Sequence, residues 1–342
     1  MKLCMDDSWV KDYPDVSDLA EADLDDNSSL KKMLALIETG KRVVDFGCAT
    51  GYFAQLLRKA GCTVVGVEIN PEAAKISEQY CESVVVADLD FVHLSEILPE
   101  ADFDVAVFGD VLEHLRDPWR VLKEARQLLK PNGFVVASIP NIAHGAIRLA
   151  LLQGNFEYTK LGILDNTHLR FFTRKTVEEL FEQSGFAVGS LDRTTHPVFF
   201  DRASVPHPSV PYLERDSLSS ELVQQIEQEQ ETSTLQFVIR AFPQSLEGKY
   251  AVLAEKYAKA VEQNAQLQAQ VQSTQTELEH SQLHGQSQLE QTQSQLEQTQ
   301  SQLQKIQLEL DQTHTLVVAM ESSSFWKLRQ TWMRFRRLVS KG

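Results

Sequence analysis

Short apolar strand patterns alternate with helical patterns between residues 42 and 192, and this alternation limits the chain to few folds. Strands are predicted at 42–46, 63–68, 83–87, 104–109, 134–139 and 186–191. Helices are predicted before and between them at 28–39, 51–60, 71–80, 118–130 and 174–184. Near-continuous apolar runs are typical of strands buried on both faces of a parallel sheet. The alternation therefore predicts βαβ units and a doubly wound α/β fold.

The regular alternation stops after residue 192. Residues 194–233 are irregular and contain prolines and histidines, with one short helix predicted at 218–230. A seventh strand is predicted at 235–242, which makes the sheet mostly parallel and seven-stranded. Long irregular segments in compact domains are usually functional or mobile. We interpret 194–233 as an insertion before the last strand of the sheet.

Residues 246–321 are rich in glutamine and carry a heptad pattern. Between 262 and 312 there are 18 glutamines and no proline. Apolar and threonine side chains recur at 3.5-residue spacing: Leu289, Leu296, Leu303 and Leu310, with Thr292, Thr299, Ile306 and Thr313 three positions later. This spacing predicts a long α-helical coiled coil through which copies of the chain associate, with a break in phase near Gly285. A disordered glutamine-rich tract is the alternative.

Charge is distributed unevenly along the chain. The formal net charge is −15, which argues against a nucleic-acid-binding protein. Residues 1–27 form an acidic N-terminal segment, whereas 325–342 hold six basic residues and no acidic one. Phe325, Leu328 and Trp332 fall on one helical face of that tail. An amphipathic basic helix of this kind predicts attachment to a membrane surface or a membrane-bound partner, and docking on an acidic protein is the alternative.

The cysteines suggest a reducing environment. Cys4, Cys48, Cys62 and Cys81 form no CxxC pair and have no matching histidine spacing, so we expect neither a metal site nor disulfides. The chain starts without the apolar run of a signal peptide, and no stretch approaches the ~18 apolar residues of a membrane span. We expect a cytoplasmic protein that reaches the inner membrane face through its tail.

The segment Val43–Gly51, VVDFGCATG, is the most informative motif. It follows a predicted strand and opens a predicted helix, where glycines let the backbone approach a ligand and the free N–H groups can bind it. Asp45 lies two residues before Gly47 and would repel a pyrophosphate, but it suits the ammonium group of an amino acid. The spacing also departs from GxGxxG, so a dinucleotide-dependent dehydrogenase is disfavoured.

Two more acidic residues end the neighbouring strands. Glu68 closes the second strand, where a carboxylate can accept hydrogen bonds from ribose hydroxyls. Asp88 follows the third strand, where its carboxylate can accept a hydrogen bond from the adenine amino group. Ligands of doubly wound folds bind at the carboxyl edge of the sheet, so these residues predict a nucleoside site there.

Five segments together resemble a known family: VVDFGCATG, GVEIN, ADLD, FDVAVFGDVLEHLRDP and LLKPNGFVVASIPN. Their order and spacing are similar to those of class I S-adenosylmethionine (SAM)-dependent methyltransferases. The resemblance is strongest to the branch with the ubiquinone-biosynthesis O-methyltransferases and the methionine-biosynthesis W type. It covers 28–192 and extends to 243, which implies a Rossmann-like methyltransferase domain at 28–243.

The resemblance implies a role for each matching residue. It places Asp45, Gly47, Ala49 and Gly51 around the methionine part of SAM, Glu68 at the ribose, Asp88 and Leu89 at the adenine, and Asp110 beside the methyl donor. The family's usual middle glycine is replaced here by Ala49. Because alanine is the smallest replacement, we expect SAM binding to survive.

His114 is the predicted general base, because it follows the fourth strand at the donor pocket and imidazole titrates near neutral pH. A helix cap or a donor-pocket wall is its alternative role. Further acceptor-side residues are predicted after the fifth strand: Asn141, His144, Tyr158, Asp165, His168 and Arg170. A structural ion-pair network of Asp165, His168 and Arg170 is the alternative.

These features predict SAM-dependent O-methylation of a polar small molecule or a saccharide. Similar coiled-coil arms with basic tails occur on cell-surface polysaccharide machinery, which implies a glycan acceptor. The alternative is a non-catalytic SAM-binding scaffold or regulator of a polysaccharide assembly complex. The residues do not identify the acceptor.

Overall fold

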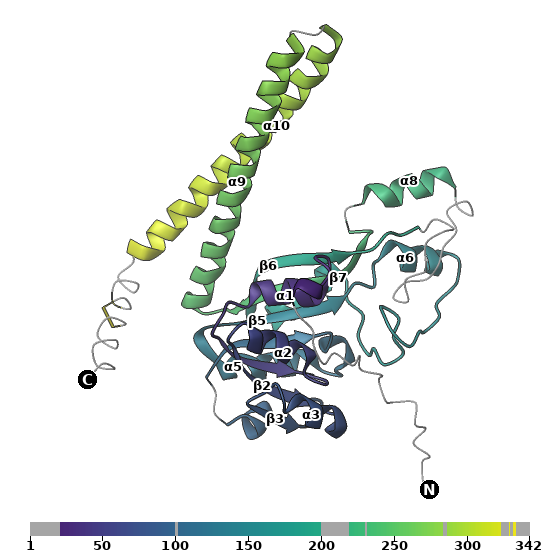
Figure 1. Cartoon of the computed structure of the whole chain (residues 1–342), viewed down its shortest axis with the longest axis vertical. Helices are drawn as coiled ribbons and strands as arrows, with labels where there is room; N and C mark the ends of the chain where they lie inside the picture. Colours follow the sequence, from purple (N-terminus) through teal and green to yellow (C-terminus); the bar gives the residue numbers. More distant parts are fainter. Residues whose placement is uncertain are drawn as a thin grey trace. The chain divides into compact units, whose positions relative to one another are not determined.

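The computed structural model describes residues 21–99, 102–199, 219–229, 231–282 and 286–322, together with Leu328, Thr331 and Trp332. The chain divides into two compact units, residues 1–244 and 245–342. The first unit holds a sheet with flanking helices and the second holds two long helices (Figure 1).

The first unit is built on a seven-stranded sheet. Its strands are β1 (Arg42–Phe46), β2 (Thr63–Glu68), β3 (Ser83–Val86), β4 (Phe103–Gly109), β5 (Leu129–Pro140), β6 (Phe186–Thr195) and β7 (Thr234–Pro243). Their order is β3-β2-β1-β4-β5-β7-β6, and β7 runs antiparallel to both neighbours while the other pairs are parallel. The predicted doubly wound, mostly parallel sheet is confirmed.

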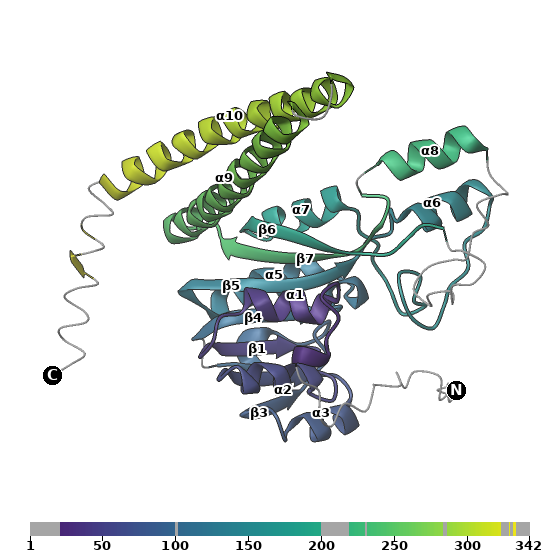
Figure 2. The ribbon, with the colours of Figure 1, turned by 45° about the horizontal axis from the view of Figure 1, so that its top comes forward.

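Helices flank the sheet on both faces (Figure 2). The α-helices of this unit are α1 (Ser29–Leu36), α2 (Tyr52–Lys59), α3 (Pro71–Ser77), α4 (Leu94–Ile97), α5 (Pro118–Leu128), α6 (Gly145–Leu152), α7 (Arg174–Gln183) and α8 (Ser220–Gln228). Two 3₁₀ turns, η2 (Glu21–Asp23) and η3 (Leu112–His114), are also present. The α1 helix contacts α2, whereas α5 contacts both α4 and α7. The two groups form the layers of an α/β sandwich.

The core lies between the central strands and these helices. Phe46 of β1 and Phe108 of β4 are fully buried and stack with ring centroids 4.7 Å apart. Val44 and Val135 are also fully buried. Each such side chain contributes about 1.5–3 kcal/mol when it leaves water, which explains why the near-continuous apolar runs form the central strands.

Strand register gathers the ends of β1, β2 and β4 at one edge. Phe46 pairs with Val67 on one side and with Phe108 on the other. The residues that follow these strands therefore emerge side by side, which places the predicted donor motif next to Glu68 and Asp110.

Two predicted helix starts are confirmed in detail. The Ser28 side chain accepts a hydrogen bond from the backbone N–H of Lys31 at the start of α1. The Asn70 side chain accepts from the N–H groups of Glu72 and Ala73, and Pro71 occupies the first turn of α3. These contacts satisfy backbone donors that a helix start leaves without partners.

Residues 131–133 fall between a predicted helix and a predicted strand, but they lie within the span of β5. Leu129 pairs with Phe103 and Phe134 pairs with Val105, so five residue steps on β5 face two on β4. The three extra residues on β5 interrupt its regular pairing with β4. This interruption agrees with the proline and glycine in the segment, which disfavour continuous strand pairing.

A small second core supports the region after β5. It joins α6 and α8 through Ile147, Leu149, Leu164, Val198 and Ile226, all of which are buried. The α8 helix lies within the predicted insertion 194–233, whereas α6 was not predicted. Residues 200–218 and 230 of the insertion lie outside the described residues.

The second unit contains α9 (Leu246–Gln282) and α10 (Gln286–Ser322), which run antiparallel to each other (Figures 1 and 2). The Asn264 side-chain amide donates to Oε1 of Gln307 at 2.8 Å, and the rings of Tyr257 and His314 lie 5.9 Å apart. Thr274, Leu296 and Thr299 of the heptad seam are buried. The seam therefore packs within the chain as a helical hairpin whose two helices flank the predicted break near Gly285.

Self-association of the chain stays a prediction, because the seam is paired within one copy. No helix among the described residues is long and apolar enough to cross a membrane. The basic tail 325–342 lies outside the described residues except for Leu328, Thr331 and Trp332.

Candidate functional site

The donor loop joins β1 to α2 through three residues with positive φ. The φ angles are +73° at Gly47, +49° at Ala49 and +83° at Gly51. A Cβ atom at Gly47 would lie 2.6 Å from Cγ2 of Val111, and one at Gly51 would lie 2.9 Å from Cα of Ser77. Both glycines are therefore required by backbone conformation and by close packing.

Ala49 occupies a conformation that suits glycine better. A left-handed backbone costs a residue with a Cβ atom roughly 1–2 kcal/mol. The backbone N–H of Ala49 donates to Oε2 of Glu68 at 2.8 Å, and this buried hydrogen bond helps to hold the strained residue in place. Alanine at the usual glycine position thus keeps a turn of the shape that the motif needs.

Glu68 organises the edge of the sheet. Its side chain is buried, and its second oxygen, Oε1, accepts from the N–H of Asn70 at 2.9 Å. Each carboxylate oxygen can accept a further hydrogen bond. The predicted contact with a ribose therefore stays compatible with this arrangement, but the position also has a structural role that the sequence did not reveal.

Asp45 is a buried acid at the end of β1. Its Oδ2 atom is shielded from solvent and has no hydrogen-bond partner among the described residues. Burial, together with the negative charge of Glu68, raises the pKa of Asp45 to about 8. A buried oxygen without a donor is costly, and a ligand ammonium would supply one. This orphaned oxygen, together with the cramped glycine loop, fits the amino-acid part of SAM.

The predicted adenine residues follow β3. The Asp88 side chain accepts from the N–H of Asp90 at 2.9 Å and is partly exposed. The Leu89 side chain is buried in the main core, and its carbonyl oxygen accepts from the guanidinium of Arg120. Asp88 therefore lies partly at the molecular surface, whereas Leu89 is part of the core.

Asp110 closes β4 in a second strained turn, with φ at +53°. Its Oδ1 atom accepts from Oγ of Ser138 at 2.9 Å and from Nε2 of Gln236 at 2.8 Å. The backbone N–H of Asp110 also donates to Oγ of Ser138 at 3.0 Å. Asp110 is thus fixed by β5 and by the antiparallel strand β7.

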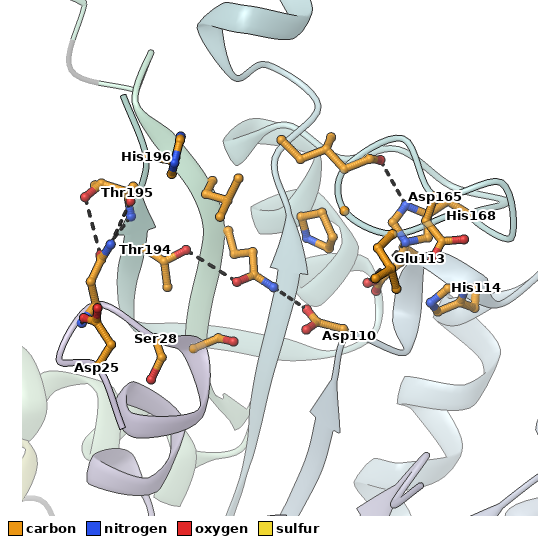
Figure 3. A pocket seen from close by; sticks show the side chains of 18 residues that line it. Asp25, Ser28, Asp110, Glu113, His114, Asp165, His168, Thr194, Thr195 and His196 are labelled. Carbon is orange, nitrogen blue, oxygen red and sulfur yellow. Dashed lines mark hydrogen bonds and ion pairs between the residues drawn. The ribbon is translucent and has the colours of Figure 1, made fainter. Parts of the chain in front are cut away.

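A cavity of about 550 Å³ opens beside Asp110 (Figure 3). Its lining comes from the segment before α1, the end of β4 with the η3 turn, the end of β5, the 161–168 loop, and the β6–β7 edge. The lining includes Asp25, Asn27, Ser28, Asp110, Glu113, His114, Asp165, His168, Thr194, Thr195, His196 and Gln236. Of the predicted residues, Asp110, His114, Asp165 and His168 are brought together here.

Sequence reasoning missed the wall formed by the N-terminal segment. Asn27 Nδ2 donates to the Thr195 carbonyl oxygen at 2.7 Å, and the Thr195 N–H donates to Oδ1 of Asn27 at 2.9 Å. These bonds attach residues 25–28 to the end of β6. Part of the predicted acidic segment, Asp25 and Asn27, therefore forms a wall of the cavity. Nothing in the sequence indicates this, because the contact joins residues that are 168 positions apart.

The opposite wall is held together by η3. The Glu113 carbonyl oxygen accepts from the N–H groups of Leu169 and Arg170 at 2.8 and 2.9 Å. His114 Nδ1 lies 3.2 Å from the Thr167 carbonyl oxygen, and its ring meets the His168 ring edge-on at 4.7 Å. If Nδ1 carries the proton that faces this carbonyl, the basic lone pair lies on Nε2. His114 thus lines the cavity with its ring anchored to the 161–168 loop.

Glu113, His114 and His168 also have the ligand types of a divalent metal site. One ligand atom from each lies within 4.8 Å of the others. Nδ1 of His168 lies 3.0 Å from the Ile163 carbonyl oxygen, and Nε2 lies 3.9 Å from Oε1 of Glu113. No metal site is predicted from the cysteine and histidine spacing, and these three residues meet only through the fold.

Four predicted acceptor-side residues do not line the cavity. Asn141 and His144 are fully buried: the Asn141 amide donates to the Thr234 carbonyl oxygen, and His144 caps the start of α6. Tyr158 is 58% exposed. The Arg170 guanidinium donates to the Arg116 carbonyl oxygen and lies over the Trp119 ring. Through these contacts Arg170 anchors the loop, and among the described residues its predicted ion pair with Asp165 is not formed.

Strand order, donor loop and carboxyl-edge acids together define a class I SAM-dependent methyltransferase fold. A family profile described as a methyltransferase domain matches residues 21–191, half of the 342 residues. The chain belongs to this methyltransferase family. S-adenosylmethionine is the cofactor of the class, and the residues around Asp45 and Gly47 fit it.

Curated relatives include ubiquinone biosynthesis O-methyltransferases. That of Paracidovorax citrulli is 31% identical over 136 residues, which cover 36% of this chain and 57% of the relative. That of Thiobacillus denitrificans is 26% identical over 195 residues, which cover 53% of this chain and 84% of the relative. The chain spans about half the length of the first curated relatives it matches.

The solved structures that the chain matches include SAM-dependent methyltransferases. A SAM-dependent methyltransferase from Archaeoglobus fulgidus is 20% identical, with a TM-score of 0.44 and coverage of 63% of this chain and 91% of that one. One from Mesorhizobium loti is 19% identical, with a TM-score of 0.41 and coverage of 63% and 98%.

Proposed function

We propose that this chain transfers a methyl group from SAM to a hydroxyl group of a polar small molecule or a saccharide. The observation that carries the proposal is the cavity, which joins Asp110 at the predicted donor edge to His114 on the opposite wall (Figure 3). SAM supplies an activated methyl group on a sulfonium. The remaining task of the protein is to align the acceptor and to remove its proton.

The cavity residues suit these two tasks. Alignment of two reactants can contribute about 7–11 kcal/mol, and a positioned base typically adds ~10²–10⁴ in rate. Nε2 of His114 accepts the proton of the acceptor hydroxyl while its oxygen forms a bond to the methyl carbon and the carbon–sulfur bond breaks. Hydroxyl and imidazole groups of Ser28, Thr194 and His196 can hydrogen-bond a hydroxylated acceptor.

A scaffold without turnover is the competing proposal. The two are separated by incubating the full chain with methyl-labelled SAM and a panel of saccharides, and by titrating it with S-adenosylhomocysteine in parallel. Binding of S-adenosylhomocysteine with labelled product supports the enzyme. Binding without transfer to any acceptor in cell-surface glycan extracts would favour the scaffold.

The second unit and the tail bear on where this reaction takes place. We infer from the heptad pattern and the basic tail that copies of the chain associate and that residues 325–342 attach to the inner membrane face, with the catalytic domain in the cytoplasm. Liposome flotation of the full chain, with and without residues 325–342, tests the attachment. Unchanged flotation of the truncated chain would contradict it.

A further inference from the structure

We propose that Glu113, His114 and His168 bind a divalent transition-metal ion of the zinc type at the wall of the cavity. One nitrogen from each histidine and one oxygen of the carboxylate lie within 4.8 Å of one another. Figure 3 shows the three side chains gathered on one side of the cavity. The site goes beyond the proposed methyl transfer, whose steps use no metal ion.

The hydrogen bonds of the two histidines place the lone pair of each ring on the same nitrogen. Nδ1 of His168 lies 3.0 Å from the Ile163 carbonyl oxygen, and Nδ1 of His114 lies 3.2 Å from the Thr167 carbonyl oxygen. A carbonyl oxygen only accepts, so each Nδ1 donates and the neutral ring carries its lone pair on Nε2. Histidines that bind metals typically have such a carbonyl behind the ring, which fixes the tautomer.

His168 directs this lone pair towards a carboxylate. Its Nε2 atom lies 3.9 Å from Oε1 of Glu113, and the two side chains are 5% and 1% exposed. Two electron-pair donors at this separation, away from water, are stabilised by a cation between them. Two ligands of a tetrahedral Zn²⁺ ion, each about 2.0–2.2 Å from it, lie roughly 3.4 Å apart. The two side chains therefore need to approach by only about half an ångström to share one ion.

The backbone holds the two parts of the site together. Glu113 and His114 belong to η3, whereas His168 ends the loop on the same wall. The carbonyl oxygen of Glu113 accepts from the N–H groups of Leu169 and Arg170 at 2.8 and 2.9 Å, directly after His168. Ligands that the fold already brings together lose less conformational freedom when the ion binds.

The ligand types select the metal. Imidazole nitrogens favour Zn²⁺ and similar transition metals, whereas Mg²⁺ and Ca²⁺ prefer sites built from oxygen atoms. Two histidines and one glutamate are the protein ligands of some catalytic zinc sites, which keep a further position open. All three residues line the cavity of about 550 Å³, so an ion can reach them from it.

The metal site and the proposed base share His114. An imidazole nitrogen that holds a metal ion has no lone pair left for a proton, so Zn²⁺ and the acceptor proton compete for Nε2. Zn²⁺ binding is thus a second property of this wall, and it can be measured without an acceptor.

The test is Zn²⁺ binding by the full chain, kept reduced, after treatment with EDTA and removal of the chelator. Competition with a metal-sensitive dye should show one tightest site per chain, of micromolar affinity or better, that a large excess of Mg²⁺ does not empty. Co²⁺ bound to the wild type provides a second measurement. Its proton NMR spectrum should show two strongly shifted, exchangeable signals, one from the Nδ1–H group of each histidine.

Matched variants identify the ligands. Glu113→Gln and His168→Gln each remove one ligand but keep a side chain that can hydrogen-bond, and each should weaken Zn²⁺ binding at least about tenfold. His93→Gln is the control and should change the affinity less than about twofold. His93 also lies beside a carboxylate, 3.1 Å from Oε1 of Glu124, but it does not belong to the cluster.

Several outcomes would overturn the inference. They are no Zn²⁺ binding at micromolar concentrations, unchanged affinity in both cluster variants, displacement of Zn²⁺ by Mg²⁺, or a Co²⁺ spectrum without the two signals. The first would indicate that a protonated His168 pairs with Glu113 without a metal ion. Failure of the chain to bind S-adenosylhomocysteine would instead contradict the proposed function and leave the metal site standing.

Discussion

The backbone N–H of Ala49 donates to Oε2 of Glu68 at 2.8 Å, which ties the donor loop to the end of β2. The same carboxylate accepts from the N–H of Asn70, so one buried acid links the donor loop to the start of α3. We therefore expect Glu68→Ala to lower the free energy of unfolding by about 1–3 kcal/mol, since two N–H groups lose their acceptor.

The same variant should weaken S-adenosylhomocysteine binding at least tenfold. Calorimetric titration and thermal unfolding of the full chain measure the two effects. Glu72→Ala, at an exposed position in the first turn of α3, is the control and should change neither by much. Wild-type affinity in Glu68→Ala would contradict the assigned role.

Ala49→Gly should raise thermal stability or leave it unchanged while S-adenosylhomocysteine binding is retained. Glycine relieves a left-handed penalty of roughly 1–2 kcal/mol, and this outweighs or balances the greater freedom it gives the unfolded chain. Ala60→Gly is the matched control, because Ala60 has φ at −79° and gains nothing from glycine. A marked loss of stability in Ala49→Gly alone would show that the alanine methyl group has its own packing role.

The pH dependence of stability should carry the signature of Asp45. Its pKa is about 8 in the folded chain, raised by burial and by Glu68 from an ordinary 3.8. The folded state therefore keeps a proton that the unfolded state has lost. The stability due to this proton is complete below about pH 4 and declines as pH rises towards about 8. Urea unfolding should thus show wild type losing stability relative to Asp45→Asn over this range.

Ligand binding should show the opposite trend. An ammonium group binds the ionised form of Asp45, so S-adenosylhomocysteine affinity of wild type should increase as pH approaches 8. Asp45→Asn should bind more weakly and lose this dependence. A parallel pH profile in the two proteins would remove Asp45 from the cofactor site.

His114→Asn should lower the methyl-transfer rate by ~10²–10⁴ while S-adenosylhomocysteine affinity stays within about twofold. Asparagine retains a donor for the Thr167 carbonyl oxygen but has no ring nitrogen that accepts a proton. His93→Asn is the control, since His93 is exposed and interacts with Glu124 outside the cavity. Single-turnover transfer to an identified acceptor is the measurement, and a full rate in His114→Asn would exclude the base.

The helical hairpin predicts an intramolecular cross-link. Asn264 and Gln307 are in hydrogen-bond contact, so the double variant Asn264→Cys/Gln307→Cys should form a disulfide within one chain on mild oxidation. Asn264→Cys/Gln302→Cys, shifted by five residues along α10, should not. Covalent dimers at the same yield, detected by non-reducing electrophoresis, would mean that the helices pair between copies.

The donor half of the site could be predicted from the sequence because its residues belong to short segments at strand ends. Gly47, Gly51 and Glu68 each follow a strand whose apolar pattern is plain, and parallel strands bring their carboxyl ends to one edge. The backbone conformations that single residues require and the alternation of strands with helices were therefore enough to predict the fold and the donor half of the site. The seven strands appear at the predicted positions for the same reason.

The acceptor half was decided by tertiary structure. Asp25, Gln236 and Thr195 come from an N-terminal segment and the two last strands, and their meeting depends on antiparallel pairing and on hydrogen bonds across more than 100 positions. Asn141 and His144 had the right chemistry in sequence, yet the fold buries them as supports for α6. Residue types indicate which chemistry is available, but only packing determines which side chains face a common cavity.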